Sequence, residues 1–198
     1  MNEWFGNNWQ WVIATIITLV SSFSFFIGRV WEKRDYRTKK DKDTFQKFQE
    51  VFPADNPVIH FLRHDDIGLL CTREFLISIK TLSRLLDEPT FFFLDKKIEN
   101  EKTTLKRTLD QLLDYTATRL FPSDRNPGYV LLIKPSDTLE RRLDILSSQG
   151  VQITCEMRQN EFEKIQKNYR NNMETLNQLA IDVYNAYVKL RIVSHKRL

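Results

Sequence analysis

The sequence predicts a mainly α-helical protein in which one N-terminal transmembrane helix precedes a cytoplasmic helical bundle. The first observation is an uncharged run of residues, 9–27, near the N-terminus. The second is a series of later segments in which apolar residues recur at helical spacing. We expect four parts: a short external N-terminus (1–8), a transmembrane helix (9–28), a basic juxtamembrane stalk (29–52) and a cytoplasmic helical domain (53–198).

The uncharged run, WQWVIATIITLVSSFSFFI, is close to the roughly 20 residues that a hydrocarbon core of about 30 Å requires. The four tryptophans of the chain flank it, as indole rings do at membrane interfaces. A cleaved signal peptide is the alternative, but no basic region precedes the run and no small-residue cleavage pattern follows it. The run is therefore predicted to span a lipid bilayer.

Basic residues set the predicted orientation of this span. Seven Lys and Arg residues follow it within residues 29–42, and none precedes it. Because such residues are enriched on the cytoplasmic side, we expect the N-terminus outside and the C-terminus in the cytoplasm. Residues 44–198 carry 23 basic and 21 acidic residues, a balance that argues against a broad nucleic-acid-binding surface and leaves room for a local basic patch.

One face of the predicted span is polar. On a helical wheel this face holds Trp11, Ala14, Thr15, Thr18, Ser21, Ser22 and Arg29, with Phe25 beside it. Ala14, Thr18 and Ser22 form a row of small residues four apart, which favours close helix packing in lipid and predicts a homo-oligomer. A water-filled pore lined by this face is one outcome, with Trp11 and Phe25 as its gates. In the alternative, the hydroxyls bond their own i−4 carbonyls and the helix is only an anchor.

After the span, the chain lacks Gly and Pro from residue 29 until Pro53, so the membrane helix is predicted to continue inward as a charged stalk. Apolar spacing then predicts helices over residues 75–86, 95–120 and 160–193. A further helix is predicted from Ser136 or Asp137 as N-cap to Gly150. The segments 129–135 and 151–157 flank that helix and could form a short two-strand element or a small βαβ unit.

Little in the sequence indicates catalysis. The five glycines cannot assemble a phosphate-binding loop or a dinucleotide fingerprint. His60 and His64 share a helix face, a spacing that can bind metal, but the glutamate of a zinc-protease motif is missing. We interpret this segment as a structural helix start, with an anchored hydrolase using His60, His64 and Asp65 as a minor alternative. Cys71 and Cys155 are expected to be reduced, structural thiols. We expect the protein to have no enzymatic activity and to bind no cofactor or metal.

Two short basic stripes are the candidate ligand-binding residues. One is Lys102, Lys106 and Arg107, and the other is Lys164, Lys167 and Arg170. Such stripes are usually solvated helix faces. The alternative is a nucleotide or oligonucleotide ligand, held by these cations and by a stacking ring such as Tyr169 or Tyr129.

Four pieces of the chain carry a resemblance to a family. They are FLRHDD (61–66), FFFLDKKIENEKTTL (91–105), LFP (120–122) and LNQLAIDVYNAY (176–187). With these pieces the chain resembles an uncharacterised family of bacterial membrane-anchored helical proteins with one N-terminal span. The resemblance implies a single-pass protein of the bacterial inner membrane.

The architecture also resembles the membrane effectors of bacterial anti-phage systems, in particular the Hailong type, in which a membrane protein is paired with a nucleotidyltransferase. That resemblance implies a homo-oligomeric ion channel, held shut by an oligonucleotide on its cytoplasmic domain, with a cytosolic nucleotidyltransferase as partner. Our leading hypothesis is thus a non-enzymatic membrane effector with a gated pore. The rival hypothesis is a non-conducting anchored scaffold that recruits a cytosolic partner.

Overall fold

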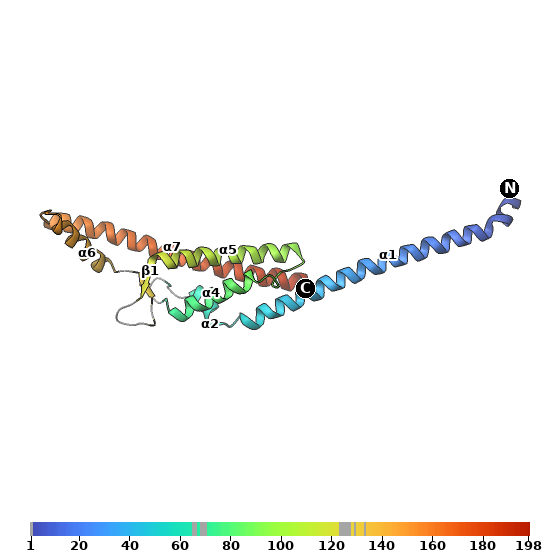
Figure 1. The fold of residues 1–198 in the computed structure, drawn as a ribbon, viewed down its shortest axis with the longest axis horizontal. Helices are drawn as coiled ribbons and strands as arrows, with labels where there is room; N and C mark the ends of the chain where they lie inside the picture. The colour runs from blue at the N-terminus through green and yellow to red at the C-terminus, as the bar shows by residue number, and fades with distance from the viewer. Residues whose placement is uncertain (1, 65–66, 68–70, 123–127, 129, 133) are drawn as a thin grey trace.

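The computed structural model describes residues 2–64, 67, 71–122, 128, 130–132 and 134–198, and these residues form a mainly α-helical protein (Figure 1). The predicted fold class is confirmed. In chain order the elements are α1 (Asn2–Val51), α2 (Pro57–His64), α4 (Arg73–Asp87), α5 (Lys96–Arg119), β1 (Leu120–Pro122), β2 (Val130–Leu132), α6 (Pro135–Ser148) and α7 (Cys155–Arg197).

Helix α1 runs for 50 residues without a break, a length of about 75 Å. Figure 1 shows its N-terminal part extending away from the rest of the molecule. All side chains from Ile13 to Arg37 are exposed in this single chain. Of the described helices, only α1 is long and apolar enough to cross a membrane, by length and composition.

The centre of the helical domain is an antiparallel pair, α5 and α7. Tyr115, near the end of α5, bonds to Asn172, whereas Lys189, near the end of α7, pairs with Glu101. The buried faces carry the leucines that the helical spacing predicted. Leu105, Leu109, Leu112, Leu176 and Leu190 are all inaccessible to solvent. Each such side chain stabilises the fold by about 1.5–3 kcal/mol, so this pair forms the core on which α2 and α4 pack.

The end of α1 belongs to this core. Phe45, Phe48 and Phe52 are buried on one face of the helix. The ring of Phe48 lies 5.7 Å from that of Tyr187, centroid to centroid, a distance typical of stabilising aromatic pairs. The Tyr187 hydroxyl donates to the carbonyl of Phe52 at 3.0 Å. The core therefore extends back into the segment expected to be a stalk.

Helix boundaries follow local capping signals, with one correction. Thr72 caps α4 and Asp95 caps α5, each through a side-chain oxygen that accepts backbone N–H groups of the first turn. The expected caps of α6, Ser136 and Asp137, are wrong, because α6 begins at Pro135. A proline at the first helical position removes one of the N–H groups that have no partner at a helix start, and its fixed φ suits the helix. Helix α6 ends at Ser148, and Gly150, with φ at +76°, stops it as predicted.

A short antiparallel pair is the only sheet among the described residues. Leu120 of β1 lies opposite Leu132 of β2, and Pro122 lies opposite Val130. The expected strand at 129–135 is therefore present over 130–132, with residues 129 and 133 outside the described part. The expected strand at 151–157 is wrong, because Thr154 accepts a hydrogen bond from the backbone N–H of Met157 and caps α7. Helix α7 consequently starts earlier and ends later than predicted.

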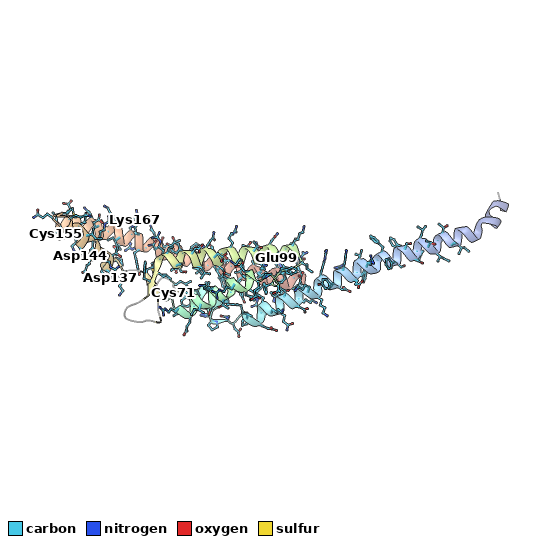
Figure 2. The ribbon with its side chains drawn as sticks, viewed as in Figure 1. Cys71, Glu99, Asp137, Asp144, Cys155 and Lys167 are labelled. Atoms are coloured by element: carbon cyan, nitrogen blue, oxygen red, sulfur yellow. The ribbon has the colours of Figure 1, made fainter. Side chains whose placement is uncertain are left out.

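Helix α6 and the first turns of α7 form an arm at the end of the domain opposite α1 (Figure 1). Leu139, Leu143 and Ile165 make a small apolar cluster between them, separate from the main core. Figure 2 shows Cys155 and Asp144 in this arm. The chain end after α7 instead returns to the place where α1 leaves the domain, so the two ends of α7 lie at opposite ends of the helical domain.

Candidate functional site

The polar face predicted on the apolar segment is uncovered in the single chain. Ala14, Thr15, Thr18, Ser21, Ser22 and Arg29 are all exposed, and so are the aliphatic residues on the opposite side of α1. The side chain of Trp11 lies outside the described side chains. The prediction that this face assembles the chain, or lines a pore, therefore stays a prediction.

The hydroxyl of Thr18 has a partner within its own helix. Its Oγ1 donates to the carbonyl oxygen of Ala14 at 2.8 Å. This i−4 bond satisfies the hydroxyl donor without a second helix. The oxygen keeps its lone pairs, so it can still accept a bond or contact an ion.

Phe25 and Arg29 lie one turn apart at the end of the apolar segment. The guanidinium carbon of Arg29 is 5.0 Å from the centre of the Phe25 ring, within the range of a cation–π contact. The expected gate and the expected cation at its mouth thus form one local unit on α1. An exposed contact of this kind contributes about 0.5–1 kcal/mol.

A buried carboxylate holds α1 against the start of α5. The two oxygens of Asp41 accept the backbone N–H groups of Leu94 and Asp95, at 2.6 and 2.9 Å. Asp95 in turn caps α5 and accepts a hydrogen bond from the guanidinium of Arg197, at the end of α7. Three helices therefore meet at this point, which we call the junction: Asp41, Leu94, Asp95 and Arg197.

The junction also shifts the pKa of Asp95. Partial burial opposes ionisation of this carboxyl group, but the hydrogen bonds from Arg197 and from the N–H groups of Lys97 and Ile98 outweigh it. The net result is a lowered pKa, so the charged form is favoured in the folded protein.

In the structure, the first basic stripe is not a free cationic surface. Lys102 is buried; its Nζ donates to the carbonyl oxygen of Phe91 at 2.8 Å and pairs with Glu99 at 2.8 Å. Lys106 pairs with Asp87 and Asp110, whose hydrogen bonds and charges raise its pKa although burial opposes the shift. Only Arg107 of this group is exposed.

The second basic stripe lies on α7 in the arm. Lys164 approaches Glu161 at 3.3 Å, and Lys167 and Arg170 are exposed. Tyr169 is partly buried nearby and lines a hollow of about 280 Å³ between α5, α6 and α7. The other stacking ring that we considered, Tyr129, lies outside the described residues. Figure 2 shows Lys167 and Glu99 at opposite ends of the domain, so the two stripes do not meet in one chain.

His60 is exposed on α2 and lines a hollow of about 490 Å³ between α2 and α7. Arg63, Tyr184, Arg191 and His195 line the same hollow. The side chain of His64, and Asp65 as a whole, lie outside the described part. Among the described residues, no group of three His, Cys, Asp or Glu could hold a metal ion.

The two cysteines differ strongly in environment, and both are free thiols. Burial raises the pKa of Cys71 to about 12, whereas Cys155 is exposed at the first position of α7. Figure 2 shows them far apart, in the bundle and at the tip of the arm. A buried thiol with a raised pKa is a poor nucleophile, in agreement with a structural role for Cys71.

No family model, curated protein or solved structure matches the chain. The candidate site therefore rests on its geometry.

That geometry reveals a group of cations that the sequence reasoning missed. Around the junction, α1, α5 and α7 enclose a cleft of about 640 Å³ lined by Arg34, Arg37, Lys96, Lys97 and Arg197. In the sequence, the first two belong to the basic stalk, whose residues are explained by their topogenic role and could also bind anionic lipid head groups. The pair Lys96-Lys97 directly follows the helix cap Asp95, and that placement was the one local signal of a cationic helix start.

Proposed function

We propose that the chain is a single-pass membrane protein whose spans associate into a gated ion-conducting pore, controlled by its cytoplasmic helical domain. In this proposal α1 crosses the bacterial inner membrane with its N-terminus outside. The mass of the helical domain then lies in the cytoplasm. No catalytic step is needed.

The observation that carries the proposal is the continuity of α1. One unbroken helix includes both the apolar segment and the residues Phe45, Phe48 and Phe52, which are buried in the domain core. A helix anchored by buried aromatic rings and by Asp41 moves with the domain as a rigid rod. Tilt or rotation of the domain is therefore transmitted to the span, which is what a gate controlled from the cytoplasm requires.

The polar face supplies the chemistry of the pore. Hydroxyls of Thr15, Thr18, Ser21 and Ser22 would partly replace the hydration of an ion, and the Phe25 rings would close the path by drying it. Arg29, one turn further, would form a ring of positive charge at the cytoplasmic mouth. Its contact with Phe25 couples the gate to this ring.

The test is expression without any regulating partner, read as membrane potential in cells and as conductance in liposomes. We expect depolarisation and arrested growth. Leucine at both Thr18 and Ser22 should relieve the effect by making the lining apolar, and alanine at Phe25 should worsen it by widening the constriction. The matched control is leucine at Ile13 and Val20, on the opposite face of α1. Protein that inserts at normal levels and never conducts contradicts the pore.

The rival function, a non-conducting scaffold, is favoured by one contact. The hydroxyl of Thr18 donates to Ala14 in the same helix, so that donor is satisfied in an isolated anchor. Cross-linking in detergent separates the two functions. Leucine at Ala14, Thr18 and Ser22 should weaken oligomers of a pore, whereas it should leave the assembly of a scaffold unchanged.

The biological setting of the proposal rests on the sequence resemblance alone. It includes a role in anti-phage defence, a nucleotide or oligonucleotide ligand on the cytoplasmic domain, and a cytosolic nucleotidyltransferase as partner.

Topology is tested first: a reporter active only in the cytoplasm should work after Leu198 and fail before Met1. The opposite result would refute the orientation, and with it the control of the pore from the cytoplasm.

A further inference from the structure

The cleft at the junction is rich in cations. Its wall on α1 carries Arg34 and Arg37, one turn apart, and its opposite wall carries Lys96 and Lys97 in the first turn of α5. Arg197 closes it from the end of α7. Five basic side chains from three helices thus face one hollow of about 640 Å³.

Two carboxylates, Asp41 and Asp95, also line the cleft, but their oxygens are already engaged. Both oxygens of Asp41 accept backbone N–H groups. One oxygen of Asp95 accepts the N–H groups of Lys97 and Ile98, and the other accepts from Arg197. These carboxylates therefore hold the three helices together, and of the cations only Arg197 is paired with one of them.

The other four cations of the cleft are Arg34, Arg37, Lys96 and Lys97. Within the described part of the chain, none of these four side chains forms an ion pair. The side chains of the cleft carry five positive and two negative charges in a concave site. Like charges held together in a hollow repel each other and raise the local concentration of anions.

We propose that this cleft binds an anion of the phosphate class. Phosphate oxygens match the planar donor fork of arginine, and lysine adds a mobile point charge. Four cations on two facing walls exceed what one carboxylate needs, and they suit a group with several anionic oxygens. Such an anion bridges α1 to the start of α5 and so holds the direction in which α1 leaves the domain.

Two sources can supply this chemistry, because the cleft lies near the proposed membrane surface. At 1.5 Å per residue, Arg34 is about 9 Å beyond Gly28, the last residue of the predicted span. The head-group layer is about 5–8 Å thick on each side of the hydrocarbon core. The anion is therefore either the head group of an anionic phospholipid or a soluble phosphate compound from the cytoplasm.

The first experiment measures binding of inorganic tripolyphosphate to the detergent-solubilised full chain, by calorimetry at low ionic strength. The cleft variant is Arg37→Glu with Lys97→Glu. The matched control is Lys42→Glu with Arg119→Glu, two exposed cations on the same helices that do not line the cleft. We expect the cleft variant to lose affinity about tenfold or more, and the control to change by less than about threefold.

Charge reversal could disturb folding near Asp41, so a neutral pair, Arg37→Gln with Lys97→Gln, accompanies it. This pair should lose affinity in the same direction and to a smaller extent, with an unchanged helical circular dichroism spectrum. Equal losses in the cleft and control variants would mean diffuse surface electrostatics and would overturn the site. So would a wild-type chain that binds tripolyphosphate no better than the cleft variant.

The second experiment separates the two sources, using nanodiscs of phosphatidylcholine with or without phosphatidylglycerol. If phosphatidylglycerol displaces tripolyphosphate from the wild-type chain, a lipid head group occupies the cleft. If tripolyphosphate binds equally in both nanodiscs, a soluble anion is the ligand. Either result supports the phosphate site, whereas failure to bind in both nanodiscs overturns it.

This inference deepens the proposed function and rests on it only for the role of the bound anion, since the cleft itself is a property of the domain. Binding and conductance are measured in separate experiments, so the phosphate site and the pore can be refuted independently. A chain that binds tripolyphosphate through the cleft but never conducts refutes the pore alone. A chain that conducts but lacks cleft-dependent binding refutes the phosphate site alone.

Discussion

The side chain of Asp41, on α1, accepts a hydrogen bond from the backbone N–H of Asp95, the residue that caps α5, at 2.9 Å. These two residues are 54 positions apart in the sequence, and both are acidic. Their carboxylates avoid each other because each is directed to its own donors. The contact places the start of α5 beside the last quarter of the long helix and so defines where α1 leaves the domain.

We expect Asp41→Ala to destabilise the domain by about 1–3 kcal/mol, because two partly buried N–H groups lose their acceptor. Asp43→Ala removes the same charge from an exposed position of the same helix and should change stability by less than about 0.5 kcal/mol. Thermal unfolding of the detergent-solubilised chain measures both. Equal effects would mean that the Asp41 contact contributes nothing specific.

The pair Asp95 and Arg197 should make stability depend on pH in the acid range. The pKa of Asp95 is lowered by folding, so its stabilising contribution is fully present above the unfolded pKa, near 3.8. That contribution is lost as the pH falls through the lower, folded pKa. Because both side chains are partly exposed, the pair contributes at most about 1 kcal/mol.

The measurement compares Arg197→Gln with the wild-type chain across this pH range. The variant should be slightly less stable at neutral pH, and the difference should shrink toward zero once Asp95 is protonated. A difference that grows on acidification would contradict the sign of the shift. The exposed Arg107→Gln serves as control and should show no such dependence.

Replacing Lys102 should affect folding rather than ligand binding. Lys102→Met keeps most of the buried stem but removes the ammonium that bonds to Phe91 and Glu99, so we expect a loss of about 1–3 kcal/mol. Arg107→Met, on an exposed face of the same helix, should be nearly neutral. Urea unfolding of the two variants tests the difference. Tripolyphosphate affinity should change little in either one.

The two thiols should react at very different rates. Cys155 is exposed and should be alkylated readily by a maleimide near neutral pH. Cys71 is buried with a pKa of about 12, so it should react only after denaturation. Mass spectrometry of the labelled chain counts the adducts, and a Cys155→Ser variant isolates Cys71. Rapid labelling of that variant in the native state would contradict the buried position.

Features set by neighbouring residues could be predicted from the sequence. The apolar segment, the unbroken helix after it and the inward leucines of α5 follow from periodicity and from the absence of Gly and Pro between Gly28 and Pro53. The cap at Asp95 is a local signal as well. Competing local signals explain the errors. Pro135 displaced the expected cap of α6, and the β-branched residues Val151, Ile153 and Thr154 resembled a strand although Thr154 caps α7.

The sequence by itself determined an apolar helix followed by helical segments with known buried faces, because those properties depend on residues within a few turns. Only the tertiary structure decided which charges are free. Lys102 and Lys106 look like surface cations in the sequence, yet Lys102 is buried and bonds to the carbonyl of Phe91, and Lys106 pairs with Asp87 of α4. Arg34 and Lys97 are 63 positions apart and meet at one cleft only because α1, α5 and α7 pack together. Periodicity reports which face of a helix is buried, but it carries no information on which distant helix covers that face.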